Sequence, residues 1–237
     1  SYLKWDANRD ITEPGSGALA LDRQTHLPVD RVRATATVMA EVARRHPDVE
    51  LMLCASGGGR SDLGTLAHFH ELWTSDNTDP VDRVRIQWGA SHLLPASVLG
   101  AHVTRWGNRP FAFACAVALS GRFGFDVDLT ALSPEELAIA RQAVAADDRL
   151  RHLVQQGELH RLVSPVGSTV GALAFVDPSG AEAALFAFSL PGDGPCDAPT
   201  ATVPVPLDAL VGAVWQIEDL TPGRAADGRG RDEGRGR

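Results

Sequence analysis

Short apolar segments that alternate with helical segments constrain the fold of this chain more than any other feature of its sequence. Between residues 1 and 155, the order of strand, loop and helix occurs five times. Buried strands that alternate with helices form a parallel sheet, so the sequence predicts an α/β fold. The residue pattern allows an open doubly wound sheet or a (β/α)8 barrel, and a complete barrel needs about 250 residues. The strand-like segments are 2–5, 49–54, 72–75, 97–103 and 123–129.

Proline and capping residues locate the helices between these strands. Pro28 and Pro80 each stand at the start of a segment with helical spacing, which is the helix position that proline prefers. Ser133 and Glu136 form a capping box ahead of a long helix that extends through Leu153. Residues 10–27 are rich in Gly, Thr and Asp, and they are expected to form a loop.

After residue 155 the pattern changes to strands without helices. Segments 161–163, 169–176 and 181–190 are strand-like, and the last two are joined by the turn-forming residues 177–180. We therefore expect three parts: the barrel-like part in residues 1–155, an antiparallel β module, with the character of a sandwich, in residues 156–220, and a disordered tail in residues 221–237. Two further strands are expected over 203–207 and 211–217.

Composition limits the functional classes. The chain has 237 residues, of which 44% are hydrophobic, as in ordinary globular domains, and a net charge of -8 argues against a nucleic-acid partner. No apolar run reaches membrane-spanning length, and no signal peptide is recognisable. Three widely spaced cysteines suit a reducing cytoplasm. Because the chain starts at Ser1 inside a strand-like run, we expect it to be part of a longer protein.

Asp6 and Asp76 are the candidate catalytic pair, because each follows a different strand with one strand between them. Strand ends converge on one pocket in a barrel, so two such carboxylates can face each other across a substrate. Lys4 is expected beside Asp6, where it favours the ionised form that a nucleophile needs. Asp76 lies near Trp73, whose apolar surface favours the protonated form that a general acid needs. The alternatives are a surface ion pair for Asp6 and an Asx turn for Asp76.

Other polar motifs have simpler explanations. The glycines of segment 57–59 allow close backbone approach to a ligand, but a nucleotide site is disfavoured because no Lys-Ser/Thr pair follows. Asp79 precedes Pro80 and is equally explained as a helix cap. His68 and His70 do not share a helix face, so a metal site there is disfavoured. His102 is more often a structural residue at a strand end than a catalyst.

Three motifs taken together resemble the bacterial α-galactosidases of glycoside hydrolase family 36. The similarity covers roughly residues 1–155, with a fainter match in the β module. The motifs are Lys4-Trp5-Asp6-Ala7-Asn8-Arg9, Cys54-Ala55-Ser56-Gly57-Gly58-Gly59-Arg60-Ser61-Asp62 and Trp73-Thr74-Ser75-Asp76-Asn77-Thr78-Asp79.

This resemblance implies the later part of a (β/α)8 barrel, about strands 4–8, followed by a small antiparallel β-sandwich module. It implies hydrolysis of terminal α-linked galactose with retention, without metal or cofactor. Asp6 matches the nucleophile of the family and Asp76 its acid/base. The residues expected to contact the sugar are Lys4, Cys54, Gly57, Asn8, Arg60 and Asp79.

We expect the substrates to be oligosaccharides of the melibiose or raffinose type, cleaved by double displacement. Galactosyl transfer, action on N-acetylgalactosamine, and a catalytically silent sugar-binding fragment remain alternatives. The paired aspartates and tryptophans of the family's earlier strands would precede Ser1, so the isolated chain is expected to be inactive. The loop over 104–108 is shorter than in the family. Full-length enzymes of the family often form homo-oligomers, and neither a membrane nor a nucleic acid is an expected partner.

Overall fold

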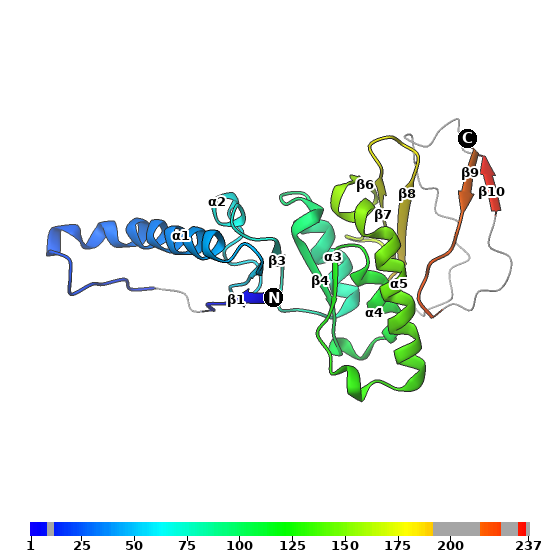
Figure 1. Ribbon diagram of the computed structural model, residues 1–237, viewed down its shortest axis with the longest axis horizontal. Helices are drawn as coiled ribbons and strands as arrows, with labels where there is room; N and C mark the ends of the chain where they lie inside the picture. Colours follow the sequence, from blue (N-terminus) through cyan, green and yellow to red (C-terminus); the bar gives the residue numbers. More distant parts are fainter. Residues whose placement is uncertain (9–11, 192–213, 224–231, 236–237) are drawn as a thin grey trace. The chain divides into compact units, whose positions relative to one another are not determined.

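The computed structural model describes residues 1–8, 12–191, 214–223 and 232–235, and it divides into two compact units. Unit 1 is Ser1–Asp76 and unit 2 is Asn77–Arg237. Both units contain parallel strands that are connected through helices (Figure 1), which confirms the predicted α/β class. Each unit is described below by itself.

Unit 1 contains three parallel strands in the order β1-β2-β3, with β2 paired to both neighbours. Leu51, Met52 and Leu53 of β2 are each exposed by 1% or less, so both faces of this central strand are buried, as is usual in parallel sheets. The elements are β1 (Tyr2–Trp5), η1 (Leu21–His26), α1 (Leu27–Arg45), β2 (Glu50–Leu53), α2 (Leu63–Leu66) and β3 (Glu71–Trp73).

The helices of unit 1 begin and end where local signals place them. Pro28 lies in the first turn of α1, and the helix ends at Arg45, ahead of Pro47. The Asp62 carboxylate accepts a hydrogen bond from the Thr65 N–H at 2.9 Å and caps α2. The expected loop over 10–27 was only partly correct, because residues 21–26 form the 3-10 helix η1 directly ahead of α1, a common addition to a helix start.

The first part of unit 2 contains the parallel pair β4–β5 with α4 between the two strands in sequence. The predicted strand over 123–129 ends earlier, at Phe125, because the Asp128 side chain accepts the Thr130 N–H at 2.9 Å and starts a 3-10 turn. The elements are α3 (Pro80–Ala90), η2 (Ala96–Val98), β4 (Leu99–Val103), η3 (Trp106–Asn108), α4 (Phe111–Ala118), β5 (Arg122–Phe125), η4 (Leu129–Ala131) and α5 (Pro134–Gln156).

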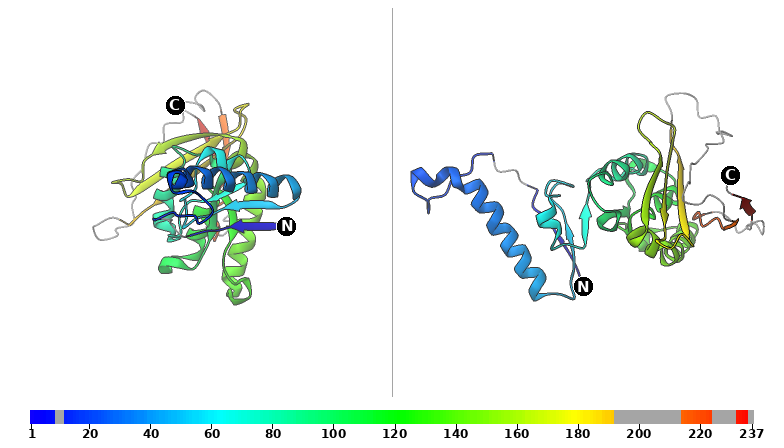
Figure 2. Two further views of the ribbon diagram at one scale, coloured as in Figure 1. Left: turned by 90° about the vertical axis from the view of Figure 1, so that its left-hand side faces the viewer. Right: turned by 90° about the horizontal axis from the view of Figure 1, so that it is seen from above.

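The second part of unit 2 is an antiparallel sheet in the order β6-β7-β8 (Figure 2). Its strands are β6 (Glu158–Val163), β7 (Val170–Val176) and β8 (Ala183–Ser189). The turn between β7 and β8 confirms the predicted turn chemistry, with Gly180 at φ 71° and the Ser179 N–H donating to Asp177 at 2.9 Å.

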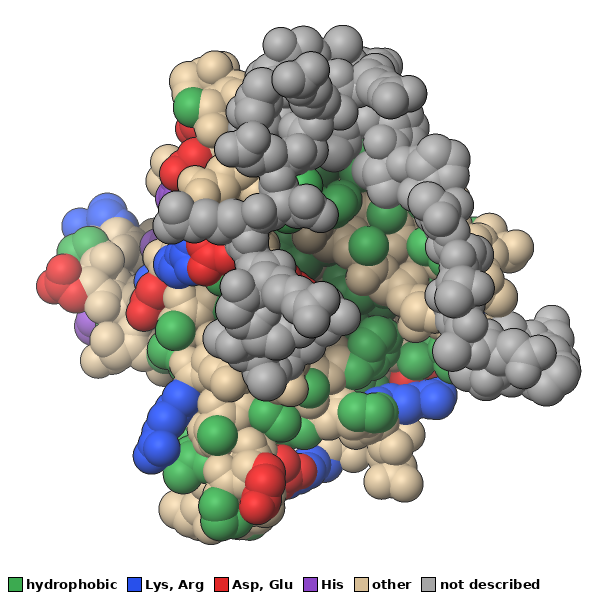
Figure 3. All heavy atoms as spheres, turned by 90° about the vertical axis from the view of Figure 1, so that its right-hand side faces the viewer, with side chains coloured by type: hydrophobic (Ala, Val, Ile, Leu, Met, Phe, Trp, Pro, Cys, Tyr) green, Lys and Arg blue, Asp and Glu red, His purple; other side chains and the backbone are tan. Residues whose placement is uncertain are grey.

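One hydrophobic core joins the helices of unit 2 to this sheet. Trp88 of α3, Leu153 of α5, Phe175 of β7 and Phe186 of β8 belong to the same buried cluster. In β8, buried and exposed residues alternate, and Leu185 on the other face is 51% exposed. Hydrophobic side chains also reach the surface on the face of the molecule shown in Figure 3. The division into domains at residues 155 and 220 stays a prediction.

The C-terminal region differs from the expected disordered tail where the structure describes it. β9 (Val214–Ile217) pairs antiparallel with β10 (Asp232–Arg235), so part of the tail is a strand. Backbone hydrogen bonds make this ladder, which does not require the apolar side chains that the tail lacks. The strand expected over 203–207 lies outside the described residues. A sandwich stays a prediction, because the described strands form one three-stranded sheet and one separate pair.

Candidate active site

Asp6 and Asp76 both follow parallel strands of unit 1, as predicted. β1 ends at Trp5, directly before Asp6, and β3 ends at Trp73, three residues before Asp76. Because β1 and β3 flank β2 in parallel, both carboxylates leave the sheet at its carboxyl edge, where ligands bind in α/β folds. Both side chains are exposed and accessible to a substrate.

The thiol of Cys54 lies at the centre of this edge, at the end of β2. Cys54 is fully buried, and its N–H donates to the Trp5 carbonyl at 2.9 Å. Burial raises the pKa of the thiol, a backbone hydrogen bond at Gly57 and the Lys4 charge lower it, and the charges of Asp6 and Asp76 raise it. The charges of Lys4, Asp6 and Asp76 therefore all act on the Cys54 thiol.

Lys4 has a different neighbour from the one expected. Its ammonium nitrogen lies 5.2 Å from the centre of the Trp73 ring, in a cation–π contact. Among the ion pairs of the described residues there is none between Lys4 and Asp6. The alternation of side chains along a strand predicted the wrong neighbour for Lys4. The reason is that β1 ends at Trp5, so Asp6 is no longer part of the strand. Trp73 itself is 4% exposed and packs with Met52 and Cys54.

The glycine loop after β2 is packed tightly against the segment that carries Asp76. Gly57 has φ 75°, and a Cβ atom there would lie 2.7 Å from the Ser75 Cα and 3.1 Å from the Asp76 nitrogen. A Cβ at Gly59 would lie 2.5 Å from the Ala55 carbonyl oxygen. Glycine is therefore required for backbone packing at both positions. Contact of Gly57 with a sugar stays a prediction.

Asn8 and Arg60 connect the segment after β1 to the glycine loop. The Asn8 side-chain oxygen accepts the Ser56 N–H at 2.7 Å, and the Ser56 hydroxyl donates to the Asn8 carbonyl at 3.2 Å. Arg60 donates to the Ala7 carbonyl at 3.1 Å. These bonds hold residues 7–8, next to Asp6, against the loop after β2. The sugar contacts expected of Asn8 and Arg60 stay predictions.

Asp79, in unit 2, is a helix cap. Its carboxylate accepts the Val81 N–H at 2.8 Å at the start of α3 and the Arg109 Nε–H at 3.1 Å. Gly107 approaches the same carboxylate so closely that a Cβ atom there would collide with it. The capping interpretation is thus confirmed, and the sugar contact stays a prediction. Sequence reasoning missed Arg109, since no local pattern links residues thirty positions apart.

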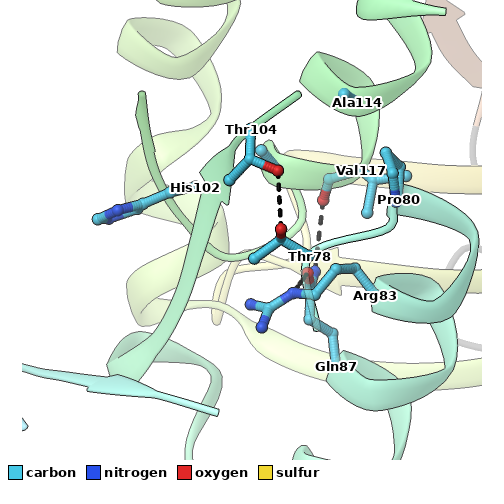
Figure 4. Close-up of a pocket in the computed structure, with 9 residues that line it drawn as sticks. Thr78, Pro80, Arg83, Gln87, His102, Thr104, Ala114 and Val117 are labelled. Atoms are coloured by element: carbon cyan, nitrogen blue, oxygen red, sulfur yellow. Dashed lines mark hydrogen bonds between the residues drawn. The ribbon is translucent and has the colours of Figure 1, made fainter. Parts of the chain in front are cut away.

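A small cavity in unit 2 lies between α3, β4 and α4 (Figure 4). Its volume of about 10 Å³ leaves room for about one water molecule and excludes a sugar ring. Its wall includes Arg83, which is 3% exposed and donates to the Gly100 carbonyl. Gln87 donates to the Val117 carbonyl and to Ser120, so it has a structural role. His102 points away from the other labelled residues in Figure 4.

Three other candidate features have structural explanations or carry no ligand role. The His70 Nδ1 accepts the Leu51 N–H at 3.1 Å, which gives this histidine a structural role. Burial raises the pKa of the Cys115 thiol to about 12, so it is protonated at neutral pH. Within the described ranges, no group of His, Cys, Asp and Glu side chains is arranged to hold a metal ion. None of the described helices is long and apolar enough to cross a membrane.

A pair of carboxylates is what most glycoside hydrolases use to cleave a glycosidic bond, and Asp6 and Asp76 follow parallel strands that end at one edge of the sheet. A family model described as Melibiase matches residues 1–157. Alpha-galactosidase AgaA of Geobacillus stearothermophilus is 39% identical over 189 residues, which cover 77% of this chain and 26% of the relative. Alpha-galactosidase C of Emericella nidulans is 40% identical over 197 residues, which cover 80% of this chain and 25% of the relative.

Solved structures agree with these relatives. The crystal structure of the Geobacillus family 36 enzyme matches with a TM-score of 0.77 at 38% identity, covering 82% of this chain and 28% of that one. The α-galactosidase of Lactobacillus brevis matches with a TM-score of 0.78 at 33% identity, covering 85% and 28%. Variants of the Geobacillus enzyme are solved in complex with raffinose and with stachyose. The chain therefore belongs to the melibiase family, glycoside hydrolase family 36, and it spans about a quarter of the length of its curated relatives.

Proposed function

We propose that this chain carries the catalytic carboxylates of a retaining α-galactosidase that acts on oligosaccharides of the raffinose type. The observation that supports this most is that Asp6 and Asp76 follow two parallel strands, β1 and β3, which flank β2 and end at the same edge of the sheet. The raffinose and stachyose complexes of the Geobacillus relative support the substrate class. In this proposal residues 1–155 form the later part of a (β/α)8 barrel, and a β module follows.

In the proposed mechanism the Asp6 carboxylate attacks the anomeric carbon, and the bond from that carbon to the glycosidic oxygen breaks. Asp76 donates a proton to this oxygen, and the leaving sugar departs. Asp76, now ionised, then takes a proton from water. The water oxygen attacks the anomeric carbon and breaks its bond to Asp6. Galactose is released with its original α configuration, because two inversions restore it.

The Lys4 side chain has two parts in this proposal. Its ammonium group donates a charge-assisted hydrogen bond to a galactose hydroxyl. The cation–π contact with Trp73 holds the flexible lysine chain in place before the sugar arrives. Trp73 lies on the strand that precedes Asp76, so one ring links the two halves of the site.

Azide rescue tests the two roles separately in the complete gene product, with 4-nitrophenyl α-galactoside as substrate. We expect Asp6→Ala to lose activity and, with azide, to yield β-galactosyl azide, because azide attacks the face that Asp6 vacated. We expect Asp76→Ala with azide to yield α-galactosyl azide from the covalent intermediate. The same azide anomer from both variants would contradict the assignment.

Product analysis tests the reaction class with the unsubstituted enzyme. NMR should show α-galactose as the first product from raffinose, and β-galactose first would exclude retention. A sugar acceptor at high concentration distinguishes a hydrolase from a transferase, since dominant transfer would favour the latter. Binding of galactose without any release of nitrophenol would favour a silent sugar-binding protein.

A further inference from the structure

The glycine loop after β2 contains a serine in a backbone conformation that serine rarely adopts. Ser56 has φ 50°, in the left-handed region, where the Cβ atom is crowded by the following carbonyl oxygen. Among the described residues, Asn108 is the only other non-glycine residue with a positive φ, and asparagine tolerates this region better than serine does. A serine in this conformation is held there by the structure around it.

Backbone hydrogen bonds within the loop keep Ser56 in this conformation. The Ala55 N–H donates to the Gly57 carbonyl at 3.1 Å, and the Gly59 N–H donates to the Ala55 carbonyl at 3.1 Å. A Cβ atom at Gly59 would lie 2.5 Å from the same Ala55 oxygen, so the loop is closed tightly on itself. These contacts restrict the direction in which the N–H and the hydroxyl of Ser56 point.

Ser56 binds the segment that carries the proposed nucleophile. Its N–H donates to the Asn8 side-chain oxygen at 2.7 Å, and its hydroxyl donates to the Asn8 carbonyl oxygen at 3.2 Å. Two bonds from one residue fix both the position and the orientation of Asn8. Asn8 is two residues after Asp6, and two residues span at most about 7 Å. A shift of Ser56 is therefore transmitted to Asp6 over a short length of chain.

Gly57, the next residue of the loop, packs against the segment that carries the proposed acid/base. A Cβ atom at Gly57 would lie 2.7 Å from the Ser75 Cα and 3.1 Å from the Asp76 nitrogen. One planar and rigid peptide bond joins Ser56 to Gly57. All of these residues belong to unit 1. The dipeptide 56–57 is therefore a spacer of fixed length between the chain segments of Asp6 and Asp76.

We propose that Ser56 is a positioning residue that fixes the separation of the Asp6 and Asp76 carboxylates. This inference rests on the proposed function of both carboxylates. Their separation matters because a retaining glycosidase needs its carboxyl groups about 5–5.5 Å apart, whereas about 6.5–9.5 Å leaves room for the attacking water of an inverting enzyme. Glycine would adopt the conformation of Ser56 without crowding, but it would lack the hydroxyl that binds Asn8.

The test separates the hydroxyl from the backbone conformation in the complete gene product, with raffinose as substrate. We expect Ser56→Gly to lower kcat about tenfold with KM nearly unchanged, because a small displacement misplaces the nucleophile. Its melting temperature should not fall, since glycine relieves the crowding. Ser56→Thr keeps the hydroxyl but is β-branched, so it should retain most of kcat and lower the melting temperature. A purely structural role would make kcat and the melting temperature fall together.

Asn108→Gly is the matched control, because Asn108 has φ 47° and the substitution makes the same backbone change in unit 2. It should keep both kinetic constants, and an equal fall in its kcat would overturn the inference.

The remaining outcomes separate this inference from the proposed function. If the unsubstituted enzyme does not cleave raffinose, the proposed function fails and takes the inference with it. If it does, an unchanged kcat in Ser56→Gly overturns the inference alone. A raised KM with unchanged kcat overturns it as well, since Ser56 would then contact the sugar. So do kcat values of both Ser56 variants that fall in step with their melting temperatures.

Discussion

Two buried thiols, Cys54 in unit 1 and Cys115 in α4 of unit 2, show how position decides the role of a residue. Cys54 and Cys115 are both fully buried, yet only Cys54 lies where the charges of Asp6, Asp76 and Lys4 meet. A buried thiol beside two carboxylates is a poor nucleophile, because burial and negative charge both oppose the thiolate. Cys54 is thus suited to packing and weak hydrogen bonding rather than to nucleophilic attack.

For a substitution at Gly57, we expect steric crowding of the added side chain to reduce activity more than the unfavourable φ angle does. Gly57→Ala should lower kcat/KM by about a hundredfold, because the new methyl displaces the backbone next to Asp76. Gly180 is a matched control, since its φ of 71° is close to the 75° of Gly57 but nothing lies within 4 Å of a Cβ there. Gly180→Ala should cost about 1 kcal/mol of stability and keep activity. Equal losses of activity from both variants would contradict this explanation.

Asn8 distinguishes a positioning role from a sugar contact. Because its side chain accepts the Ser56 N–H, Asn8→Ala should release the segment next to Asp6. We expect kcat to fall about tenfold with KM nearly unchanged, which is the pattern of a lost transition-state interaction. Steady-state kinetics with raffinose measure both constants. A raised KM with unchanged kcat would instead support the sugar contact that the sequence predicts.

At the scale of the element, local sequence signals were sufficient to predict where helices start. They could not predict contacts between segments that lie far apart in the sequence. The starts of α1, α3 and α5 follow from Pro28, Pro80 and Ser133, since each signal acts within one helical turn. The placement of Asp6 and Asp76 at one edge of the sheet could be predicted because parallel strands end at the same edge. The cation–π contact of Lys4 and the ion pair of Arg109 depend on chain segments far apart in sequence, and periodicity carries no information about them.

An ion pair that depends on pH, between Glu136 and Arg105, joins the start of α5 to the loop over residues 104–108. Glu136 caps the helix through the Ser133 N–H and pairs with Arg105, and the Arg105 hydrogen bonds, followed by the Ser133 bond, lower the pKa of this carboxyl to about 2. A lowered pKa in the folded state stabilises the fold fully above the ordinary value of 4.5, and this contribution is lost as the pH falls toward 2.

We therefore expect Glu136→Gln to lower the melting temperature at pH 6, and this difference should shrink at pH 3 as the unsubstituted protein loses the same charge. Thermal unfolding of the two proteins at both pH values measures the effect. Glu135→Gln is the control, because Glu135 lies in the same first turn and no ion pair is recorded for it among the described residues. A difference that grows on acidification would contradict the assigned direction.

At the scale of the whole molecule, the core of unit 2 bears on how the chain is divided into domains. The sequence places a boundary near residue 155, where the pattern of helices and strands ends. The buried cluster that contains Trp88, Leu153, Phe175 and Phe186 extends across that position. Residues that share one core lose their packing together, so the helices α3 and α5 and the sheet β6-β7-β8 are expected to unfold as one unit.

Phe175→Ala tests this expectation, because Phe175 is 1% exposed and touches the shared core. The substitution should cost about 3–5 kcal/mol and lower the amide protection of α3, α5 and β7 by the same factor. Hydrogen exchange with peptide-level detection on the complete gene product measures each element. Leu185→Ala is the control, since Leu185 lies on the opposite, half-exposed face of β8. Loss of amide protection in β6–β8 alone, with α3 still protected, would contradict this expectation. Residue 155 would then mark a domain boundary. The shared cluster would be an interface between two independently stable domains.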